Sequence, residues 1–120
     1  MGTITWFTGN TQAGKTTLAE ALRSAFEKDG KTVYVIDGDV LRAKYKTKLG
    51  FSKADRWKNN LNAAEMAVEL QKEYDHVLVA VICPYKTLRK KVKKLTKCKF
   101  VYIEGGKVGE QYPYDHPNLY

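Results

Sequence analysis

The sequence contains few cysteines and no long apolar run, and both shortages exclude classes of protein. Its 120 residues hold two cysteines, Cys83 and Cys98, which form neither a CxxC pair nor a zinc-ligand pattern. The core must therefore form without disulfide or metal support, and a reducing cytoplasm is the expected location. No apolar run approaches the ~20 residues that cross a bilayer, and the first residues lack the pattern of a signal peptide. We expect neither a membrane partner nor export.

Internal repeats, low-complexity segments and dividing linkers are also absent from the sequence. With 43% hydrophobic residues, the chain is long enough to bury one core. We therefore predict one domain over residues 1–120, and the sequence does not indicate its oligomeric state.

Basic residues outnumber acidic ones by 21 to 13, which gives a net charge of +8 and attracts anions of any kind. A predicted helix after residue 85 carries much of the excess, with Leu88, Val92 and Leu95 as its expected buried stripe. Its basic face is either an ordinary solvated surface or a contact for nucleic acid or phosphate, and charge does not separate these interpretations. The basic residues here are Lys86, Arg89, Lys90, Lys91, Lys93, Lys94, Lys97 and Lys99, and an earlier cluster holds Lys44, Lys46 and Lys48.

A phosphate-binding loop of the Walker A form runs from Gly9 to Thr16. Its two glycines allow successive backbone N–H groups to turn inward around phosphate oxygens. Lys15 is placed to reach the β and γ phosphates, and the Thr16 hydroxyl to ligate the Mg²⁺ that bridges them. A glycine-rich turn before a helix is the alternative interpretation. The predicted ATP-binding residues are Gly9, Asn10, Thr11, Gln12, Ala13, Gly14, Lys15, Thr16 and Thr17.

Hydrophobic patterning predicts strands that alternate with helices, which is typical of an α/β fold. Strands are expected at 3–8, 32–36, 76–82 and 98–104, with a helix over 15–28, a short one closed by Gly50 and a long one capped by Ser52. This order favours a parallel sheet of about four to five strands covered by helices on both faces. The expected inner faces are Leu18, Leu22, Ala25 and Phe26 on the first helix, and Ala63, Met66, Ala67, Leu70 and Tyr74 on the long helix.

Three segments follow strands and should meet at the carboxyl edge of this sheet: the loop at Gly9, the turn at Asp37 and the turn at Cys83. Asp37 and Asp39 flank a glycine, so one carboxylate could face the metal or accept a hydroxyl proton during phosphoryl transfer. The alternative is that both only cap the next helix. Arg42 lies one turn further on, where a guanidinium suits bidentate contact with phosphate or sulfate.

Several motifs follow one another along the chain: Asp37-Gly38-Asp39-Val40-Leu41-Arg42, Leu49-Gly50-Phe51-Ser52, Asp55-Arg56, Asn59 and Ile82-Cys83-Pro84-Tyr85-Lys86 with Arg89. In their order and spacing, over roughly residues 2–104, they resemble the adenylylsulfate (APS) kinases. The resemblance implies a P-loop kinase fold and transfer of the ATP γ-phosphate to the 3′-hydroxyl of adenylyl sulfate, with Mg²⁺.

The same resemblance implies roles for individual residues, with Lys15, Asp37 and Asp39 as the catalytic group. Asp39 would lie near the acceptor hydroxyl, Arg42 and Arg56 would bind the phosphosulfate end of the acceptor, and Asn59 would hold its polar groups. Phe51 would stack on adenine, although core packing is an equal alternative for this ring. Pro84 and Tyr85 complete the expected acceptor site.

The chain also departs from this family. Cys83 stands where the family usually has serine, and Leu61 and Asn62 stand where an arginine pair is common. The basic lid helix that follows Glu104 in the family is replaced by a glycine-rich segment, which indicates a deleted lid and room for a larger acceptor. Two alternatives follow: a kinase for another hydroxyl, such as a hydroxymethylated base in DNA, or a non-catalytic, nucleotide-dependent module that binds nucleic acid.

Overall fold

The structure is a computed structural model that describes residues 2–9, 14–45 and 52–103. Strands and helices alternate along it as the hydrophobic pattern predicts. The elements are β1 (Thr3–Gly9), α1 (Lys15–Lys28), β2 (Val33–Asp37), α2 (Gly38–Tyr45), α3 (Lys53–Leu70), β3 (His76–Ala80), α4 (Lys86–Thr96) and β4 (Lys99–Ile103).

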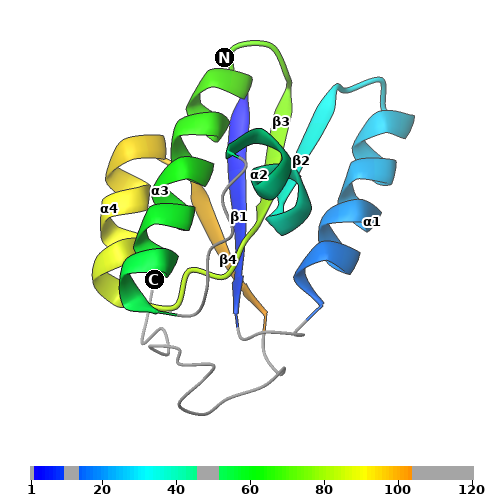
Figure 1. Cartoon of the computed structure of the whole chain (residues 1–120). Helices are drawn as coiled ribbons and strands as arrows, with labels where there is room; N and C mark the ends of the chain where they lie inside the picture. The colour runs from blue at the N-terminus through cyan, green and yellow to red at the C-terminus, as the bar shows by residue number, and fades with distance from the viewer. Residues whose placement is uncertain (1, 10–13, 46–51, 104–120) are drawn as a thin grey trace.

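The four strands form one parallel sheet in the order β2-β3-β1-β4, which confirms the predicted fold class. Pairing of Trp6 with Val79 and Asp37 with Ala80 brings the ends of β1, β2 and β3 to one edge. Ligands of such sheets bind beyond the carboxyl ends of the strands, where neighbouring strands send their helices to opposite faces. β1 and β3 are such a pair, because α1 and α4 lie on opposite sides of the sheet (Figure 1).

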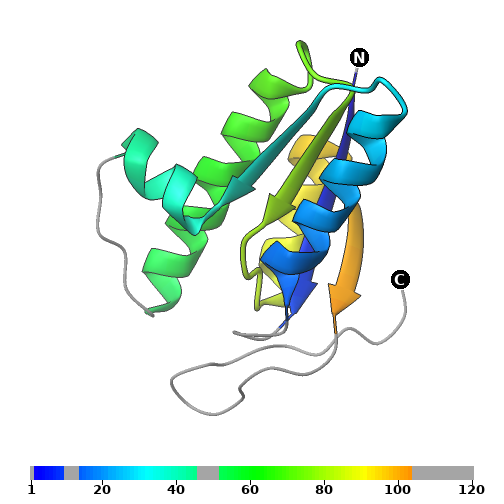
Figure 2. The ribbon, with the colours of Figure 1, turned by 90° about the vertical axis from the view of Figure 1, so that its right-hand side faces the viewer.

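Helices cover both faces of the sheet, as Figures 1 and 2 show: α1 lies on one face, and α3 and α4 lie on the other. The strands serve both faces by alternation, since successive side chains point to opposite sides. Trp6 of β1 is fully buried on the α3–α4 side, whereas the neighbouring Phe7 is buried with Ala19 on the α1 side. The sheet is therefore apolar on both faces, which explains the continuous apolar runs in its strands.

The inner faces of two helices differ from the expected stripes. On α1, Leu18 is 37% exposed and Ala25 is exposed, while Ala19 is fully buried against the sheet. On α4, Leu88 and Val92 are buried as expected, but Leu95 is 53% exposed. A slight rotation of a helix about its axis buries residues on one side of its apolar stripe and exposes residues on the other side. Tertiary packing sets this rotation.

The ends of several elements also differ from the predicted ones. Ser52 caps α3 as expected, with its hydroxyl accepting the Asp55 N–H at 3.1 Å, but α3 ends at Leu70, before Tyr74. The N–H of Cys98 donates to the Thr96 hydroxyl at 3.1 Å, so Cys98 precedes β4. No helix within the described ranges is both long enough and apolar enough to cross a membrane.

Candidate active site

Glycine is required at two positions of the phosphate-binding loop, for a different structural reason at each. Gly9 ends β1, and a Cβ there would collide with the backbone carbonyl of Ile103 on the neighbouring strand. Gly14 precedes α1 with a φ of 92°, a left-handed conformation that side chains other than glycine rarely adopt. The close approach and the positive φ both support the Walker A interpretation over an incidental turn. The loop residues Asn10, Thr11, Gln12 and Ala13 lie outside the described residues.

The first turn of α1 lines a hollow of about 210 Å³ formed by Gly14, Lys15, Thr16 and Thr17. Backbone N–H groups at a helix N-terminus point outward without intrahelical partners, and the helix dipole adds positive potential there. No acidic residue lies in this turn. The Lys15 ammonium donates to the Gly9 carbonyl at 3.4 Å, which holds the lysine back over the loop. This hollow has the chemistry of a phosphate site.

Lys15 is also electrostatically coupled to Arg56, which lies at the start of α3. Burial, and then the positive charge of Arg56, lower the pKa of Lys15 to about 8. Arg56 itself is only 5% exposed, and burial lowers its pKa while Tyr85 opposes that shift. The structure thus brings the predicted phosphate lysine together with a predicted acceptor arginine and with Tyr85. Such a concentration of partly buried positive charge is suited to an anion.

The acidic turn at the end of β2 separates the two predicted carboxylates. Asp37 Oδ1 accepts the Val40 N–H at 2.9 Å, which is the capping contact of the alternative interpretation. Asp39 in the first turn of α2 has an 85% exposed side chain and forms an ion pair with Arg42. Arg42 also lies close over Gly38. Both Asp39 and Arg42 therefore face solvent beside the carboxyl edge of β2, while Asp37 stabilises the start of the helix.

The turn after β3 carries the third set of predicted residues. Pro84 is fully buried, and the half-buried Tyr85 ring has the Lys53 ammonium 5.1 Å from its centroid. Burial raises the pKa of the Cys83 thiol, which is 0% exposed, well above its ordinary range. A thiol that stays protonated and inaccessible is a poor nucleophile. Cys83 therefore packs in the core and does not take the place of a reactive serine.

Asn59 and Asn60 differ sharply although they are adjacent on α3. The predicted Asn59 is half-buried and three residues beyond Arg56, so both lie on one helical face. Asn60 is fully buried, and its amide nitrogen donates at 2.8 Å to the Arg56 carbonyl and at 2.8 Å to the Ile82 carbonyl. Asn60 is not among the site residues predicted from the sequence, although an asparagine inside an otherwise apolar helical face is a signal that could identify it. Phe51 lies outside the described residues.

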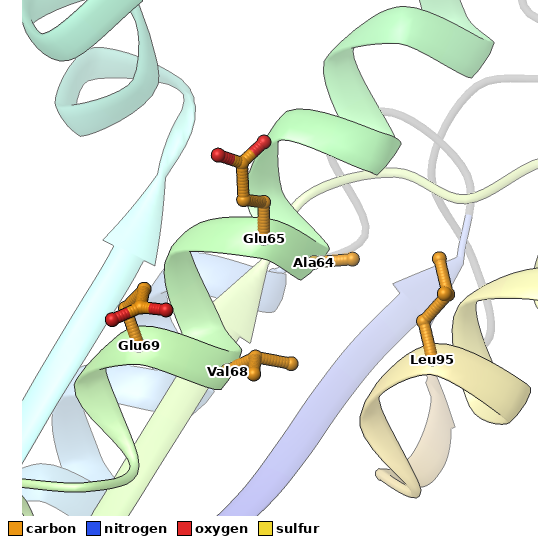
Figure 3. A pocket seen from close by; sticks show the side chains of 5 residues that line it. All are labelled: Ala64, Glu65, Val68, Glu69 and Leu95. Atoms are coloured by element: carbon orange, nitrogen blue, oxygen red, sulfur yellow. The ribbon is translucent and has the colours of Figure 1, made fainter.

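A second hollow, of about 270 Å³, lies between α3 and α4 (Figure 3). Ala64 and Val68 of α3 point toward the exposed Leu95 of α4, and Glu65 and Glu69 of α3 complete its lining. It is separate from the hollow at the start of α1, and none of the predicted site residues lines it.

Comparison with known proteins identifies the family. The family model for adenylylsulphate kinase matches residues 1–107. The chain belongs to the adenylylsulphate kinase family. It is 40% identical over 103 residues to a probable adenylyl-sulfate kinase of Archaeoglobus fulgidus, covering 86% of this chain and 66% of that protein. It is 43% identical over 104 residues to an adenylyl-sulfate kinase of Chloroflexus aurantiacus, covering 86% of this chain and 56% of that protein.

Solved structures of APS kinases have the same fold. The hexameric APS kinase from Thiobacillus denitrificans aligns with a TM-score of 0.78 at 34% identity, over 99% of this chain and 24% of that chain. The Mycobacterium tuberculosis APS kinase CysC in complex with AMPPNP and APS aligns with a TM-score of 0.68 at 32% identity, over 84% of this chain and 60% of that chain. The chain thus spans less than two thirds of the length of each of these relatives.

The residues present in this family member fit a magnesium ion that arrives with a nucleotide. The exposed Thr16 lies beside Lys15 in the hollow at the start of α1. In the described ranges, no three His, Cys, Asp or Glu side chains gather into a metal site. Within these ranges the protein's own ligand would be the Thr16 hydroxyl, and Mg²⁺ commonly takes its other ligands from substrate phosphates and water.

The basic face of α4 is exposed at Lys90, Lys91, Lys93 and Lys94. Exposure is common to both interpretations of this face, the solvated surface and the anion contact. Nucleic-acid binding by α4 therefore stays a prediction from charge alone.

Proposed function

We propose that this member of the adenylylsulphate kinase family transfers the γ-phosphate of ATP to the 3′-hydroxyl of adenylyl sulfate. The observation that carries this proposal is the position of the buried Arg56 near Lys15, because it places a predicted acceptor ligand beside the phosphate hollow. The names of the matched relatives, including one complex with AMPPNP and APS, support the same substrates. The small anionic nucleotide would therefore lie beyond the carboxyl edge of the sheet, between the first turn of α1 and the first turn of α3.

The donor side rests on the first turn of α1. Lys15 is the proposed ligand of the β and γ phosphates, and its ammonium would leave the Gly9 carbonyl for a phosphate oxygen. The Thr16 hydroxyl would hold the magnesium ion, which neutralises phosphate charge when bound. Developing negative charge on the transferred group would be stabilised by Lys15 and by the N–H groups of the helix start.

In the proposed reaction, the 3′-oxygen of the acceptor forms a bond to the γ-phosphorus as the bond from that phosphorus to the bridging β–γ oxygen breaks. ADP leaves with the electron pair of the broken bond. The hydroxyl proton passes to the Asp39 carboxylate, which is solvent-exposed and lies next to the carboxyl edge of β2. Asp37 would support this group indirectly, because it fixes the start of α2 through the Val40 N–H.

The acceptor side rests on α2, α3 and the turn after β3. Arg56 and Arg42 are the proposed ligands of the phosphosulfate end, and Asn59 would contact polar groups one turn along α3 from Arg56. Tyr85 would form the wall of the site across from the start of α3, and the fully buried Pro84 would shape the turn that carries Tyr85. Stacking of Phe51 on the adenine stays a prediction, since Phe51 lies outside the described residues.

We also propose that the protein works in a reducing compartment such as the cytoplasm. Cys83 and Cys98 are both free and buried, and an oxidising compartment is not needed for the fold.

An ADP-release assay tests the proposal, with Mg²⁺ and ATP present and adenylyl sulfate added or withheld. We expect ADP release to rise with adenylyl sulfate and a phosphorylated nucleotide product to form in equal amount. Release at the ATP-only rate would rule out this acceptor. Labelled phosphate that appears instead in DNA containing hydroxymethylated bases would identify the alternative kinase, and tight ATP binding without turnover of either acceptor would identify the binding module.

A further inference from the structure

Three consecutive carbonyl groups in the turn after β3 are each held by a buried side chain. The Val81 carbonyl accepts the Trp6 indole N–H at 3.0 Å, and the Ile82 carbonyl accepts the Asn60 amide at 2.8 Å. The Cys83 carbonyl accepts two donors, the Arg89 guanidinium at 2.7 Å and the Thr8 hydroxyl at 3.3 Å. Trp6, Thr8, Asn60 and Arg89 are each at most 1% exposed, so all four donors act away from solvent.

These side chains replace the sheet as the means of holding the turn. β3 ends at Ala80, and buried carbonyl groups beyond it still need donors. The donors come from β1, from α3 and from α4, so the path of the turn depends on three separate elements. In Figure 1 the turn runs from β3 past the lower end of α3 to α4. The residues that follow the clamped carbonyls are Pro84 and Tyr85.

Asn60 has a particular place among the four donors, because it links both parts of the proposed acceptor site. One amide nitrogen donates to the carbonyl of Arg56 on its own helix and to the carbonyl of Ile82 in the turn. Asparagine is a poor residue for a helix interior, since its side chain competes for backbone groups. Here the hydrogen bonds of that side chain connect the part of α3 that carries Arg56 and Asn59 to the turn that carries Tyr85.

We propose that Asn60 is a positioning residue for acceptor binding. It fixes the distance between the start of α3 and the Cys83-Pro84-Tyr85 turn, and this distance sets the affinity for the acceptor. The expected effect of Asn60 on acceptor affinity rests on the proposed function. Its effect on the position of the turn rests on the hydrogen bonds alone. Loss of the Asn60 link leaves the donor hollow at the start of α1 in place. The effect therefore falls on the acceptor and not on ATP.

Two variants and one matched control test this inference. Asn60→Leu removes both hydrogen bonds at similar volume. Asn60→Ser is the milder change, since a serine hydroxyl can still bond the carbonyl four residues earlier but is too short to reach Ile82. Thr96→Val is the control: Thr96 is 5% exposed and its hydroxyl bonds the Val92 carbonyl and the Cys98 N–H, away from the turn.

We expect both Asn60 variants to raise KM for adenylyl sulfate by about tenfold or more, because small displacements of positioning groups are costly. KM for ATP should stay within about twofold, and Thr96→Val should leave both constants within that range at a comparable melting temperature. An unchanged KM for adenylyl sulfate in Asn60→Ser would overturn the inference. A parallel rise of both constants, in the variants and in the control, would overturn it too.

Hydrogen exchange separates this inference from the proposed function. If the wild-type protein does not phosphorylate adenylyl sulfate, the proposed function fails, and the link is then tested by exchange in the peptide that covers residues 81–86. We expect exchange there to rise about tenfold in Asn60→Ser, with the β1 peptide unchanged. Equal exchange in wild type and variant would overturn the positioning role whatever the substrate.

Discussion

The Arg56 guanidinium at the start of α3 lies close enough to Lys15 in the phosphate hollow to affect its pKa: burial first, and the Arg56 charge second, lower the pKa of Lys15 to about 8. Burial lowers the pKa of Arg56 as well. Two cations held together and partly desolvated are unfavourable until an anion joins them. Their proximity therefore favours the binding of a polyphosphate and links the protonation of Lys15 to that binding.

The first prediction concerns the pH dependence of ATP affinity. Only the charged form of Lys15 attracts phosphate, and its charged fraction declines as the pH rises through about 8. The dissociation constant of a non-hydrolysable ATP analogue should therefore rise by up to about tenfold per pH unit above that value. Bound phosphate returns the pKa toward its usual range, so binding near pH 8.5 should take up a proton. Titration calorimetry in two buffers of different ionisation enthalpy measures both effects.

The Arg56→Met variant tests whether the charge of Arg56 contributes to the lowered pKa of Lys15. Removing the neighbouring charge should raise the pKa of Lys15 and shift the decline in affinity to higher pH. Arg42→Met is the control, since Arg42 is exposed, paired with Asp39 and not among the causes of the Lys15 shift. Affinity that stays constant to pH 9.5 in the wild type would contradict the coupling.

The second prediction separates the two carboxylates of the acidic turn. Asp37→Ala removes the acceptor of the Val40 N–H and should lower the free energy of unfolding by about 0.5–2 kcal/mol, as loss of a helix cap does. Asp39→Asn should lower kcat by about 10²–10⁴-fold, the usual contribution of a general base, and leave affinity for the ATP analogue unchanged. Urea unfolding and single-turnover kinetics measure the two effects.

The opposite assignment is also recognisable. If Asp39→Asn keeps its kcat while Asp37→Asn, which retains a capping oxygen, loses it, then Asp37 is the proton acceptor. The exposure of Asp39 and the capping bond of Asp37 favour the first outcome.

The third prediction is that Cys83 contributes to stability and not to chemistry. Cys83→Ala should leave kcat unchanged, and iodoacetamide should label neither cysteine in the folded protein, because both are buried. The folded pKa of Cys83 lies above its unfolded value of about 8.5. The contribution of Cys83 to the free energy of unfolding is therefore fully present below that pH. It declines at higher pH by about 1.4 kcal/mol per pH unit. In urea unfolding, the free energy of unfolding should fall less between pH 7.5 and pH 9.5 for Cys83→Ala than for wild type.

The comparison of wild type with Cys83→Ala isolates this effect, since the other titrating groups are common to both proteins. Rapid labelling of the folded protein, or loss of turnover in Cys83→Ala, would indicate an accessible thiol with a role in the reaction.

The parts of the site that follow from local sequence could be predicted from it. The bounds of α1, the left-handed Gly14 and the Ser52 cap depend on neighbours within a few residues, and the structure has each of them. The convergence of Gly9, Asp37 and the Cys83 turn also follows, because parallel strands bring their carboxyl ends to one edge.

Features that depend on distant contacts could not be predicted in this way. The ion pair of Asp39 with Arg42 competes with the roles that both residues were expected to have, and only their conformation shows it. The importance of Asn60 depends on Ile82, which is 22 residues away in the chain. The rotation of α4 that buries Arg89 and Thr96 and exposes Leu95 depends on its packing against α3 and the sheet.

The fourth prediction tests that rotation of α4 with two leucines of the same helix. Leu88 is 0% exposed and Leu95 is 53% exposed, although the helical period places both near one stripe. Leu88→Ala should lower the free energy of unfolding by about 2–5 kcal/mol, since it leaves a cavity in the core. Leu95→Ala should change it by no more than about 0.5 kcal/mol, because the lost contacts lie at the surface. Urea unfolding at low protein concentration measures both, and equal losses would place Leu95 in a buried contact and contradict the observed rotation.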